Sequence, residues 1–227
     1  MHLAIVIPVY NEEKVIRKVI NSLPKRLEGI DEITVLAIND GSKDDSEQEI
    51  SKTGATLVSH YTNLGAGCAT ATGLEAARRL GADVTVTFDG DGQHDPLDIA
   101  KVIKPILKKR ADLVIGTRLL SPKGMPHHKR IGNWGLNLIT YLLSGKWTSD
   151  SQSGLKAFSA HALEKIDLDT AGYEFCSEII LEATRKRLKI CEIPIKVIYT
   201  PYSRSKGQSV LNGVNIVAKL ILKKLTG

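Results

Sequence analysis

Two aspartates separated by a single glycine, Asp89 and Asp91, carry the strongest chemical signal in this 227-residue sequence. They follow an apolar run that begins at Val84, and a second glycine follows Asp91. Two carboxylates this close together repel each other unless a cation lies between them. Mg²⁺ favours one or two carboxylates completed by phosphate oxygens and water. The pattern therefore predicts a site for a divalent metal, Mg²⁺ or Mn²⁺, and for phosphate; the alternative is a simple Asp-Gly turn at a sheet edge.

Polar and glycine residues follow two earlier apolar runs as well. Asp40 comes after one of them, where its carboxylate can accept hydrogen bonds from a nucleobase or ribose; the alternative is a turn that leads into the next helix. The segment 63–67 has two glycines before a helical pattern and could bring backbone N–H groups near a phosphate. A dinucleotide fingerprint requires a third glycine where Thr70 stands, and no Gly-Lys-Ser/Thr sequence occurs. A dehydrogenase and a P-loop NTPase are therefore not expected.

These residues lie at the ends of short apolar runs that alternate with helical patterns. The expected strands are residues 3–9, 33–39, 56–59, 84–89, 112–117, 155–159 and 190–198. The expected helices are residues 12–22, 44–52, 67–80, 96–110, 134–144, 174–188 and an amphipathic segment, 209–225. This alternation predicts an α/β fold, a Rossmann-like doubly wound and mostly parallel sheet, whose ligands bind beyond the carboxyl ends of the strands. Residues 118–133, with two prolines and two glycines, are expected to form a long loop that closes over the site.

Charge is distributed unevenly along the chain. Lys and Arg number 31 against 25 Asp and Glu, which gives a formal net charge of +6. Residues 185–227 hold ten basic residues and one acid, whereas residues 1–184 hold 21 basic and 24 acidic residues. A basic C-terminal part suits a phosphate group and an anionic membrane surface. The aromatic content of 5% and the acidic N-terminal part argue against a nucleic-acid partner.

The cysteines and the hydropathy of the chain indicate its surroundings. Three cysteines without a Cys-x-x-Cys pair argue against a disulfide framework and fit a cytoplasmic protein. No apolar run approaches the roughly 18–20 residues that cross a bilayer. Any membrane contact is therefore expected to be peripheral, on the cytoplasmic face. The segment 209–227 offers such a contact, and docking of its apolar face on the protein core is the alternative.

Five sequence motifs occur in the order seen in family 2 glycosyltransferases. They are Pro8-x-Tyr10-Asn11-Glu12-Glu13, Asn39-Asp40-Gly41-Ser42, Asn63-x-Gly65-x-Gly67, Asp89-x-Asp91-x-Gln93-His94 and Gly116-Thr117-Arg118. Over residues 1–210 the chain resembles most the branch with dolichyl-phosphate mannose and glucose synthases, which are polyprenyl-phosphate glycosyltransferases. The resemblance implies a GT-A fold, a nucleotide-sugar donor, a divalent metal and inversion at the anomeric carbon.

The resemblance also implies roles for residues at the strand ends. The residues expected to hold the nucleotide are Pro8, Tyr10, Glu12, Ile38, Asp40, Gly67 and Asp89. The residues expected to hold the metal and the diphosphate are Asp89, Asp91 and Gln93. Asn39 replaces the more common aspartate of its motif, which leaves the choice between UDP and GDP open. In this interpretation a single domain, 1–227, comprises a nucleotide-sugar half (1–117), an acceptor half (118–208) and a C-terminal helix (209–227).

The segment 150–158 is similar to the acceptor side of the same branch, and Asp150 has two alternative roles there. If the acceptor is a sugar hydroxyl of a glycan or glycolipid, Asp150 is the candidate general base. If the acceptor is a polyprenyl monophosphate, the group is already largely ionised at neutral pH, since its second pKa is about 6. Cations that position this phosphate then matter more than a base. The candidates are Arg118, Arg130, Lys156 and Arg204.

The sequence therefore predicts an inverting hexosyltransferase with Asp91, Arg118 and Asp150 as its catalytic residues. We expect it to move a hexose from a UDP- or GDP-linked donor to a polyprenyl (dolichyl) phosphate. Gln152 makes the acceptor segment more similar to dolichyl-phosphate glucosyltransferases, which favours UDP. The alternative is transfer to a sugar hydroxyl, with Asp150 as the base.

Overall fold

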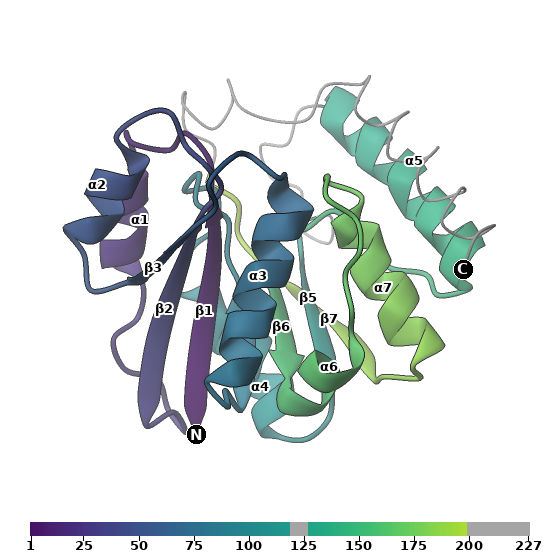
Figure 1. Ribbon diagram of the computed structural model, residues 1–227. Helices are drawn as coiled ribbons and strands as arrows, with labels where there is room; N and C mark the ends of the chain where they lie inside the picture. The colour runs from purple at the N-terminus through teal and green to yellow at the C-terminus, as the bar shows by residue number, and fades with distance from the viewer. Residues whose placement is uncertain (119–126, 199–227) are drawn as a thin grey trace.

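The computed structural model describes residues 1–118 and 127–198, which fold around a single seven-stranded sheet (Figure 1). The strands are β1 (His2–Val9), β2 (Glu32–Asn39), β3 (Thr56–Ser59), β4 (Val84–Thr87), β5 (Leu113–Thr117), β6 (Lys156–Ser159) and β7 (Ile190–Pro194). Their order across the sheet is β3-β2-β1-β4-β6-β5-β7. Among these strands only β6 runs antiparallel to its neighbours. The expected α/β fold with a doubly wound, mostly parallel sheet is confirmed.

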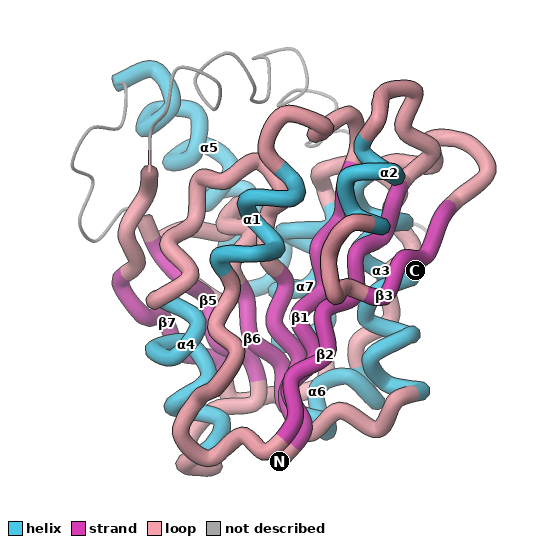
Figure 2. The backbone as a smooth tube through the Cα atoms, turned by 90° about the vertical axis from the view of Figure 1, so that its left-hand side faces the viewer, coloured by secondary structure: helices cyan, strands magenta, loops and turns pink. Residues whose placement is uncertain are grey.

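Helices cover both faces of this sheet (Figures 1 and 2). One face packs against α1 (Ile16–Ser22), α2 (Ser46–Ser51) and α4 (Asp98–Leu107), and the other against α3 (Ala66–Arg79), α6 (Ala160–Lys165) and α7 (Phe175–Arg185). A further helix, α5 (His127–Ser144), packs on α7. Along β1, Leu3 and Ile5 face the first layer and Ala4 and Val6 face the second, because successive side chains of a strand point to opposite faces. Both faces of the central strand must therefore be apolar.

The expected strands are all present, although β4 and β7 end earlier than expected. The expectation of a loop over 118–133 is wrong in its second part, since α5 already begins at His127. Three of the four Pro and Gly residues in this range precede His127, and the remaining Gly132 costs a helix only about 1 kcal/mol. The short helix α6 was not expected; Ser159 Oγ caps it by accepting a hydrogen bond from the Ala162 N–H at 3.1 Å.

Strand β6 joins the two parts of the chain. It lies between β4 and β5 and is antiparallel to both, although it follows them in the sequence. The expected nucleotide-sugar half and the expected acceptor half therefore share one sheet. The turn at 150–154, directly before β6, is carried to the end of β4, where Thr87 Oγ1 donates to the Gly154 carbonyl at 2.7 Å.

The turns that follow β1 and β2 are tied together by hydrogen bonds. The Asn11 N–H donates to Ser42 Oγ at 3.1 Å, and the Glu12 N–H donates to Ser46 Oγ at 2.7 Å. In the opposite direction, the Lys43 N–H donates to Asn11 Oδ1 at 2.9 Å. The two strand ends predicted to carry ligands therefore form one continuous edge of the molecule.

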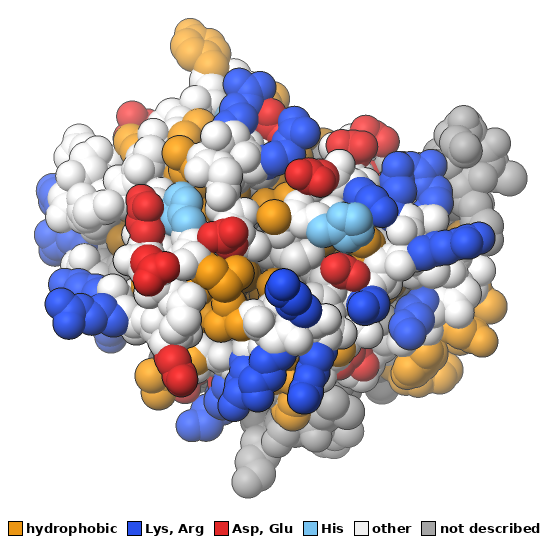
Figure 3. All heavy atoms as spheres, turned by 90° about the horizontal axis from the view of Figure 1, so that it is seen from below, with side chains coloured by type: hydrophobic (Ala, Val, Ile, Leu, Met, Phe, Trp, Pro, Cys, Tyr) orange, Lys and Arg blue, Asp and Glu red, His pale blue; other side chains and the backbone are white. Residues whose placement is uncertain are grey.

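Part of the basic C-terminal charge lies at the opposite edge, where the parallel strands begin. Lys and Arg side chains are spread over this surface, with acids between them (Figure 3). Arg185, Lys186, Arg187 and Lys189 lie here, at the end of α7 and before β7. Positive charge is favourable at a helix C-terminus, which accounts for their position. The interpretation that the basic C-terminal part marks the acceptor site is therefore wrong for these four residues.

Candidate active site

Asp89 and Asp91 lie in the loop after β4, in an environment of concentrated negative charge. Burial, with the negative charges of Asp89 and Glu12, raises the pKa of Asp91. Burial also opposes ionisation of Asp89, but the hydrogen bond and charge of His94, together with the charge of Arg118, hold the pKa of Asp89 below its usual range. At Asp91 the charge of His94 does not offset burial and the neighbouring carboxylates, and a divalent cation would supply the missing positive charge.

Gln93 lies beside these carboxylates and adds a side-chain oxygen to the set. Its backbone N–H donates to Asp91 Oδ1 at 2.9 Å, and its side-chain amide contacts Asp91 Oδ2. The described residues hold no group of three or more His, Cys, Asp or Glu side chains placed to bind a metal ion. A cation on Asp89 and Asp91 would thus take further oxygen ligands, as hard cations do from phosphates and water. The residues present fit the predicted Mg²⁺ or Mn²⁺.

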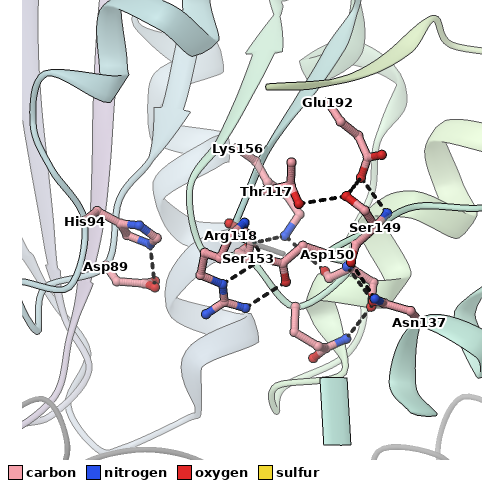
Figure 4. A network of polar contacts seen from close by, with 12 residues as sticks. Asp89, His94, Thr117, Arg118, Asn137, Ser149, Asp150, Ser153, Lys156 and Glu192 are labelled. Atoms are coloured by element: carbon pink, nitrogen blue, oxygen red, sulfur yellow. Dashed lines mark hydrogen bonds and ion pairs between the residues drawn. The ribbon is translucent and has the colours of Figure 1, made fainter. Parts of the chain in front are cut away.

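His94 supports this loop, and sequence reasoning assigned it no role. His94 is 3% exposed, and its ring packs edge-on against Phe88. Its Nε2 lies 2.9 Å from Asp89 Oδ2 (Figure 4). Within the described part of the chain, His94 Nδ1 is buried without a hydrogen-bond partner. Because the Asp89 carboxylate can only accept, Nε2 carries the proton that is donated in this contact. His94 therefore orients Asp89, as outer residues orient the ligands of metal sites.

Gly154 leaves room for the Asp89 carboxylate. A Cβ atom on Gly154 would lie 2.0 Å from Asp89 Oδ1 and 2.1 Å from Asp89 Oδ2. Asp89, in the loop after β4, thus requires a glycine at position 154. The insertion of β6 beside β4 brings these two residues together.

We expect Gly154→Ala to weaken Mn²⁺ binding about tenfold or more, the loss typical when the support of a metal ligand is disturbed. The new methyl group must displace the Asp89 carboxylate from its 2.9 Å contact with His94. Isothermal titration of Mn²⁺ in the presence of UDP measures the effect. Gly54→Ala is the control, because a Cβ there meets no atom within 4 Å. Equal affinities in the two variants would contradict the expectation.

A cavity of about 740 Å³ lies beyond the carboxyl ends of β1, β2 and β3. Tyr10, predicted to hold the nucleotide, lines this cavity and is 41% exposed. Pro8 is the penultimate residue of β1. Glu12 lies close enough to Asp91 for its negative charge to raise the pKa of Asp91. The side chain of Ile38 is fully buried in the core, so the expectation that it contacts a nucleotide is wrong for the side chain.

Asp40 is surrounded by hydrogen-bond donors from the loop after β3. Its Oδ1 accepts from the Leu64 N–H at 2.9 Å and lies 2.7 Å from His60 Nδ1. Its Oδ2 accepts from the Gly65 N–H at 2.8 Å and from Asn63 Nδ2 at 2.9 Å. A carboxylate has about four acceptor positions. In this structure Asp40 therefore holds the 60–65 loop in place, and a nucleobase would have to displace one of these partners.

The glycine segment 63–67 makes room for a second loop. The Gly67 N–H donates to the Ala171 carbonyl at 2.7 Å, and a Cβ on Gly67 would lie 2.0 Å from the Thr170 carbonyl oxygen. Buried Glu178 of α7 anchors the same loop by accepting from the Thr170 N–H at 3.1 Å. The Gly67 N–H is thus already paired, and the structure does not support the expectation that it binds phosphate.

Arg118 and Asp150 form a buried, two-point ion pair (Figure 4). Arg118 Nε donates to Asp150 Oδ2 at 2.7 Å, and Arg118 Nη2 donates to Asp150 Oδ1 at 2.8 Å. The Arg118 backbone N–H also donates to Oδ2, at 2.9 Å. The Asp150 side chain is 0% exposed and that of Arg118 is 16% exposed. The structure therefore brings these two predicted catalytic residues together, with the guanidinium as the accessible member.

Lys156, predicted to bind the acceptor phosphate, lies beneath the turn at 150–154. It is 1% exposed, and its Nζ contacts the Ser153 carbonyl and lies 3.4 Å from the Ser151 carbonyl oxygen. The expectation of direct phosphate contact is wrong, because β6 directs the ammonium into the protein. Its charge still reaches the site, since it helps to lower the pKa of Asp89.

The turn that carries Asp150 is also held from β5 and β7. Ser149 Oγ lies 2.7 Å from Thr117 Oγ1 (Figure 4). Glu192 of β7 accepts from the Ser149 N–H at 2.7 Å and from Ser149 Oγ at 2.9 Å. Glu192 is the single acid of residues 185–227. Its position as a lone acid among basic residues was the only feature of the sequence that could have indicated its contact with Ser149.

Tyr173 reaches the site from the loop before α7. Burial, with the negative charges of Asp89 and Asp91, raises the pKa of its hydroxyl, and the side chain is still 48% exposed. No motif of the sequence indicated that this tyrosine lies near the paired aspartates.

Part of the predicted acceptor side falls outside the described residues. This part comprises the side chain of Arg130, the residue Arg204 and the segment 209–227. Their roles stay predictions, as does the choice between core and membrane for the last segment.

The sequence was compared with protein families and with curated proteins. The family model of glycosyl transferase family 2 matches residues 4–167. An uncharacterized protein of Methanocaldococcus jannaschii is 45% identical over 97% of this chain and 91% of its own length. The UDP-N-acetylglucosamine–dolichyl-phosphate N-acetylglucosaminyltransferase of Methanococcus voltae is 42% identical over 97% of this chain and 95% of its own length.

The fold has counterparts among solved structures. Glucosyl-3-phosphoglycerate synthase of Mycobacterium tuberculosis, in complex with Mn²⁺, UDP-glucose and phosphoglyceric acid, superimposes with a TM-score of 0.72 at 22% identity. The match covers 99% of this chain and 79% of that one. Ordered strand-end motifs, the sheet topology and the family match lead to one conclusion: the chain belongs to glycosyltransferase family 2, and it is a glycosyltransferase with the GT-A fold.

Proposed function

We propose that this enzyme moves a hexose from a UDP-linked donor to a polyprenyl phosphate. The observation that carries the acceptor class is the Arg118–Asp150 pair, in which the carboxylate is fully buried and the guanidinium is partly exposed. The charge of Arg118 acts on Asp89, so this cation lies near the metal loop. A positive fork at this place suits an incoming phosphate.

Transfer to a sugar hydroxyl is less well supported. A general base must come within hydrogen-bond reach of the proton that it removes. Both Asp150 oxygens accept hydrogen bonds from Arg118, and the side chain is 0% exposed. Asp150 is therefore better suited to orienting Arg118 than to taking a proton from a hydroxyl group.

The proposed reaction is a single in-line displacement that inverts the anomeric carbon. Arg118 holds the acceptor phosphate so that one of its oxygens attacks the sugar from the face opposite the nucleoside diphosphate. Asp89, Asp91 and Gln93 would hold a divalent cation, and that cation would neutralise the charge that develops on the departing diphosphate. No general base is needed, because the acceptor oxygen is already largely ionised at neutral pH.

The choice of a UDP-linked donor rests on the relative from Methanococcus voltae, which is named for UDP-N-acetylglucosamine and dolichyl phosphate. Gln152, whose resemblance favoured UDP, donates to Ser177 Oγ of α7 at 2.9 Å. Its contacts thus support the turn that carries Asp150. UDP-N-acetylglucosamine is the first donor to test.

A polyprenyl acceptor would bring the enzyme to a membrane surface, which we place at the cytoplasmic face. None of the helices in the described ranges is long and apolar enough to span a membrane. Residues 118–149 contain five basic residues and no acid, a balance that favours anionic lipid. Trp134 and Tyr141 of α5 and Trp147 beyond it are exposed, and these side chain types favour membrane interfaces.

A donor and acceptor matrix tests the proposal. Radiolabelled UDP-N-acetylglucosamine, UDP-glucose and GDP-mannose are each incubated with the enzyme and with vesicles that carry a polyprenyl phosphate, with Mn²⁺ or with EDTA. We expect lipid-extractable label from a UDP-linked donor and only with Mn²⁺. Lipid-extractable label from GDP-mannose alone would overturn the proposal of a UDP-linked donor. Label in the presence of EDTA would overturn the proposal that a divalent metal is required. Transfer to a soluble glycan but not to lipid would overturn the acceptor class.

A further inference from the structure

Asn137 of α5 bonds to the backbone on both sides of Asp150 (Figure 4). Its Nδ2 donates to the Ser149 carbonyl at 2.6 Å. Its Oδ1 accepts from the Ser151 N–H and from Ser151 Oγ, each at 2.8 Å. Asn137 is 2% exposed, so no bulk water replaces these partners. One buried amide thus fixes the residues that precede and follow the aspartate.

The position of Asp150 in turn decides the direction of Arg118. Three hydrogen bonds of 2.7–2.9 Å join the two residues, one of them from the Arg118 backbone. A two-point pair between guanidinium and carboxylate has a fixed geometry, because both groups are planar. A shift of the 149–151 turn would therefore rotate or withdraw the guanidinium.

We propose that Asn137 is a positioning residue for the acceptor, which acts by fixing Asp150 and, through it, the guanidinium of Arg118. This inference rests on the proposed function, in which Arg118 binds the acceptor phosphate. It makes α5 a part of the acceptor site by way of a side chain that never meets the substrate. Gly154, which lies against Asp89, is held separately at the end of β4, where its carbonyl accepts from Thr87 Oγ1 at 2.7 Å. We therefore expect the clamp to act on Arg118 more than on Asp89.

A second buried polar residue of α5 separates this role from general support of the helix. Thr140 Oγ1 lies 2.8 Å from Ser177 Oγ of α7, so it connects α5 to its neighbouring helix. Thr140 is 0% exposed and sits one turn from Asn137. Loss of the Thr140 contact should loosen helix packing, while the hydrogen bonds from Asn137 to both sides of Asp150 remain.

The test compares Asn137→Ala with Thr140→Val in the full-length enzyme. For Asn137→Ala we expect the KM for polyprenyl phosphate to rise about tenfold or more, the kind of loss that misplacement of a binding group causes. The KM for the sugar donor and the affinity for Mn²⁺ with UDP should stay within twofold of wild type. Thr140→Val should lower the melting temperature and should raise the acceptor KM far less than Asn137→Ala does, since it reaches the 150–154 turn only through Ser177 and Gln152.

A double variant tests whether Asn137 acts through Asp150. If it does, Asn137→Ala combined with Asp150→Asn should lose no more acceptor kcat/KM than Asp150→Asn alone. Losses that multiply in the double variant would overturn the inference. Equal rises in the donor and acceptor KM would overturn it too, as would an acceptor KM of Thr140→Val that rises as much as that of Asn137→Ala. Asn137→Ser replaces Asn137→Ala if the latter does not fold, since a hydroxyl cannot span both partners. A wild-type enzyme without transfer to polyprenyl phosphate would instead refute the proposed function.

Discussion

Asp91→Asn is expected to lower kcat/KM by about 10³-fold and, at the same time, to stabilise the metal-free protein. The activity loss corresponds to about 4 kcal/mol of transition-state stabilisation, a typical contribution of a cation at a departing diphosphate. The gain in stability follows from the raised pKa of Asp91. A carboxyl group whose pKa is raised by folding destabilises the native state once the pH exceeds its ordinary value of 3.8. At pH 7 the neutral amide removes that cost.

Steady-state kinetics and urea unfolding in EDTA measure these two opposite changes. Asp95→Asn is the matched control, because it removes one negative charge from the same loop and keeps the oxygen that accepts from the Leu97 N–H at 3.0 Å. Its activity should stay near that of wild type. Retained activity in Asp91→Asn would refute the metal site, and a loss of stability would refute the account of the charge around it.

Arg118→Gln is expected to destabilise the protein by about 3 kcal/mol and to remove binding of the polyprenyl phosphate. The substitution leaves Asp150 fully buried without its ionic partner, and an uncompensated buried charge costs about 3–5 kcal/mol. The acceptor phosphate loses the fork proposed to hold it. Urea unfolding gives the first effect, and the dependence of the rate on acceptor concentration gives the second.

The two effects of Arg118→Gln separate in a second variant. Adding Asp150→Asn to Arg118→Gln should restore much of the stability, because the unpaired charge is gone, but it should restore no activity. Arg110→Gln, which changes an exposed arginine before β5, controls for the loss of one positive charge. Recovered activity in the double variant would show that Arg118 only neutralises Asp150. Unchanged stability in Arg118→Gln alone would contradict the buried pair.

The elements of the fold could be predicted because their signals are local. Apolar runs such as 3–9 and 84–89 follow the period and composition of buried strands, and glycines and acids mark where they end. The start of α5 within the 118–133 segment was not predicted. Proline and glycine cluster in the first part of this segment and make its overall composition typical of a loop. The helix α6 is only six residues long, which is too short for a periodic pattern to appear.

Single residues of the site were harder to predict, since one residue type serves several roles. Asp40 and Lys156 were assigned to ligands because they are charged and lie inside motifs. In the structure Asp40 accepts four hydrogen bonds from the 60–65 loop, and Lys156 is buried under the Asp150 turn. Their spacing in the sequence is the same in either role. Only the packing of neighbours decides which partner a charged group meets.

The amino-acid sequence alone was enough to identify the residues at the strand ends, and with them the family and the oxygen-rich loop proposed to bind a metal. These follow from local periodicity and from five motifs in order. Tertiary structure decided that β6 inserts beside β4, and this placed Gly154 against Asp89 and Asp150 against Arg118. It also turned Asn137 and Glu192 towards the same turn. Contacts between distant segments depend on the register and direction of strand pairing, which no local pattern specifies.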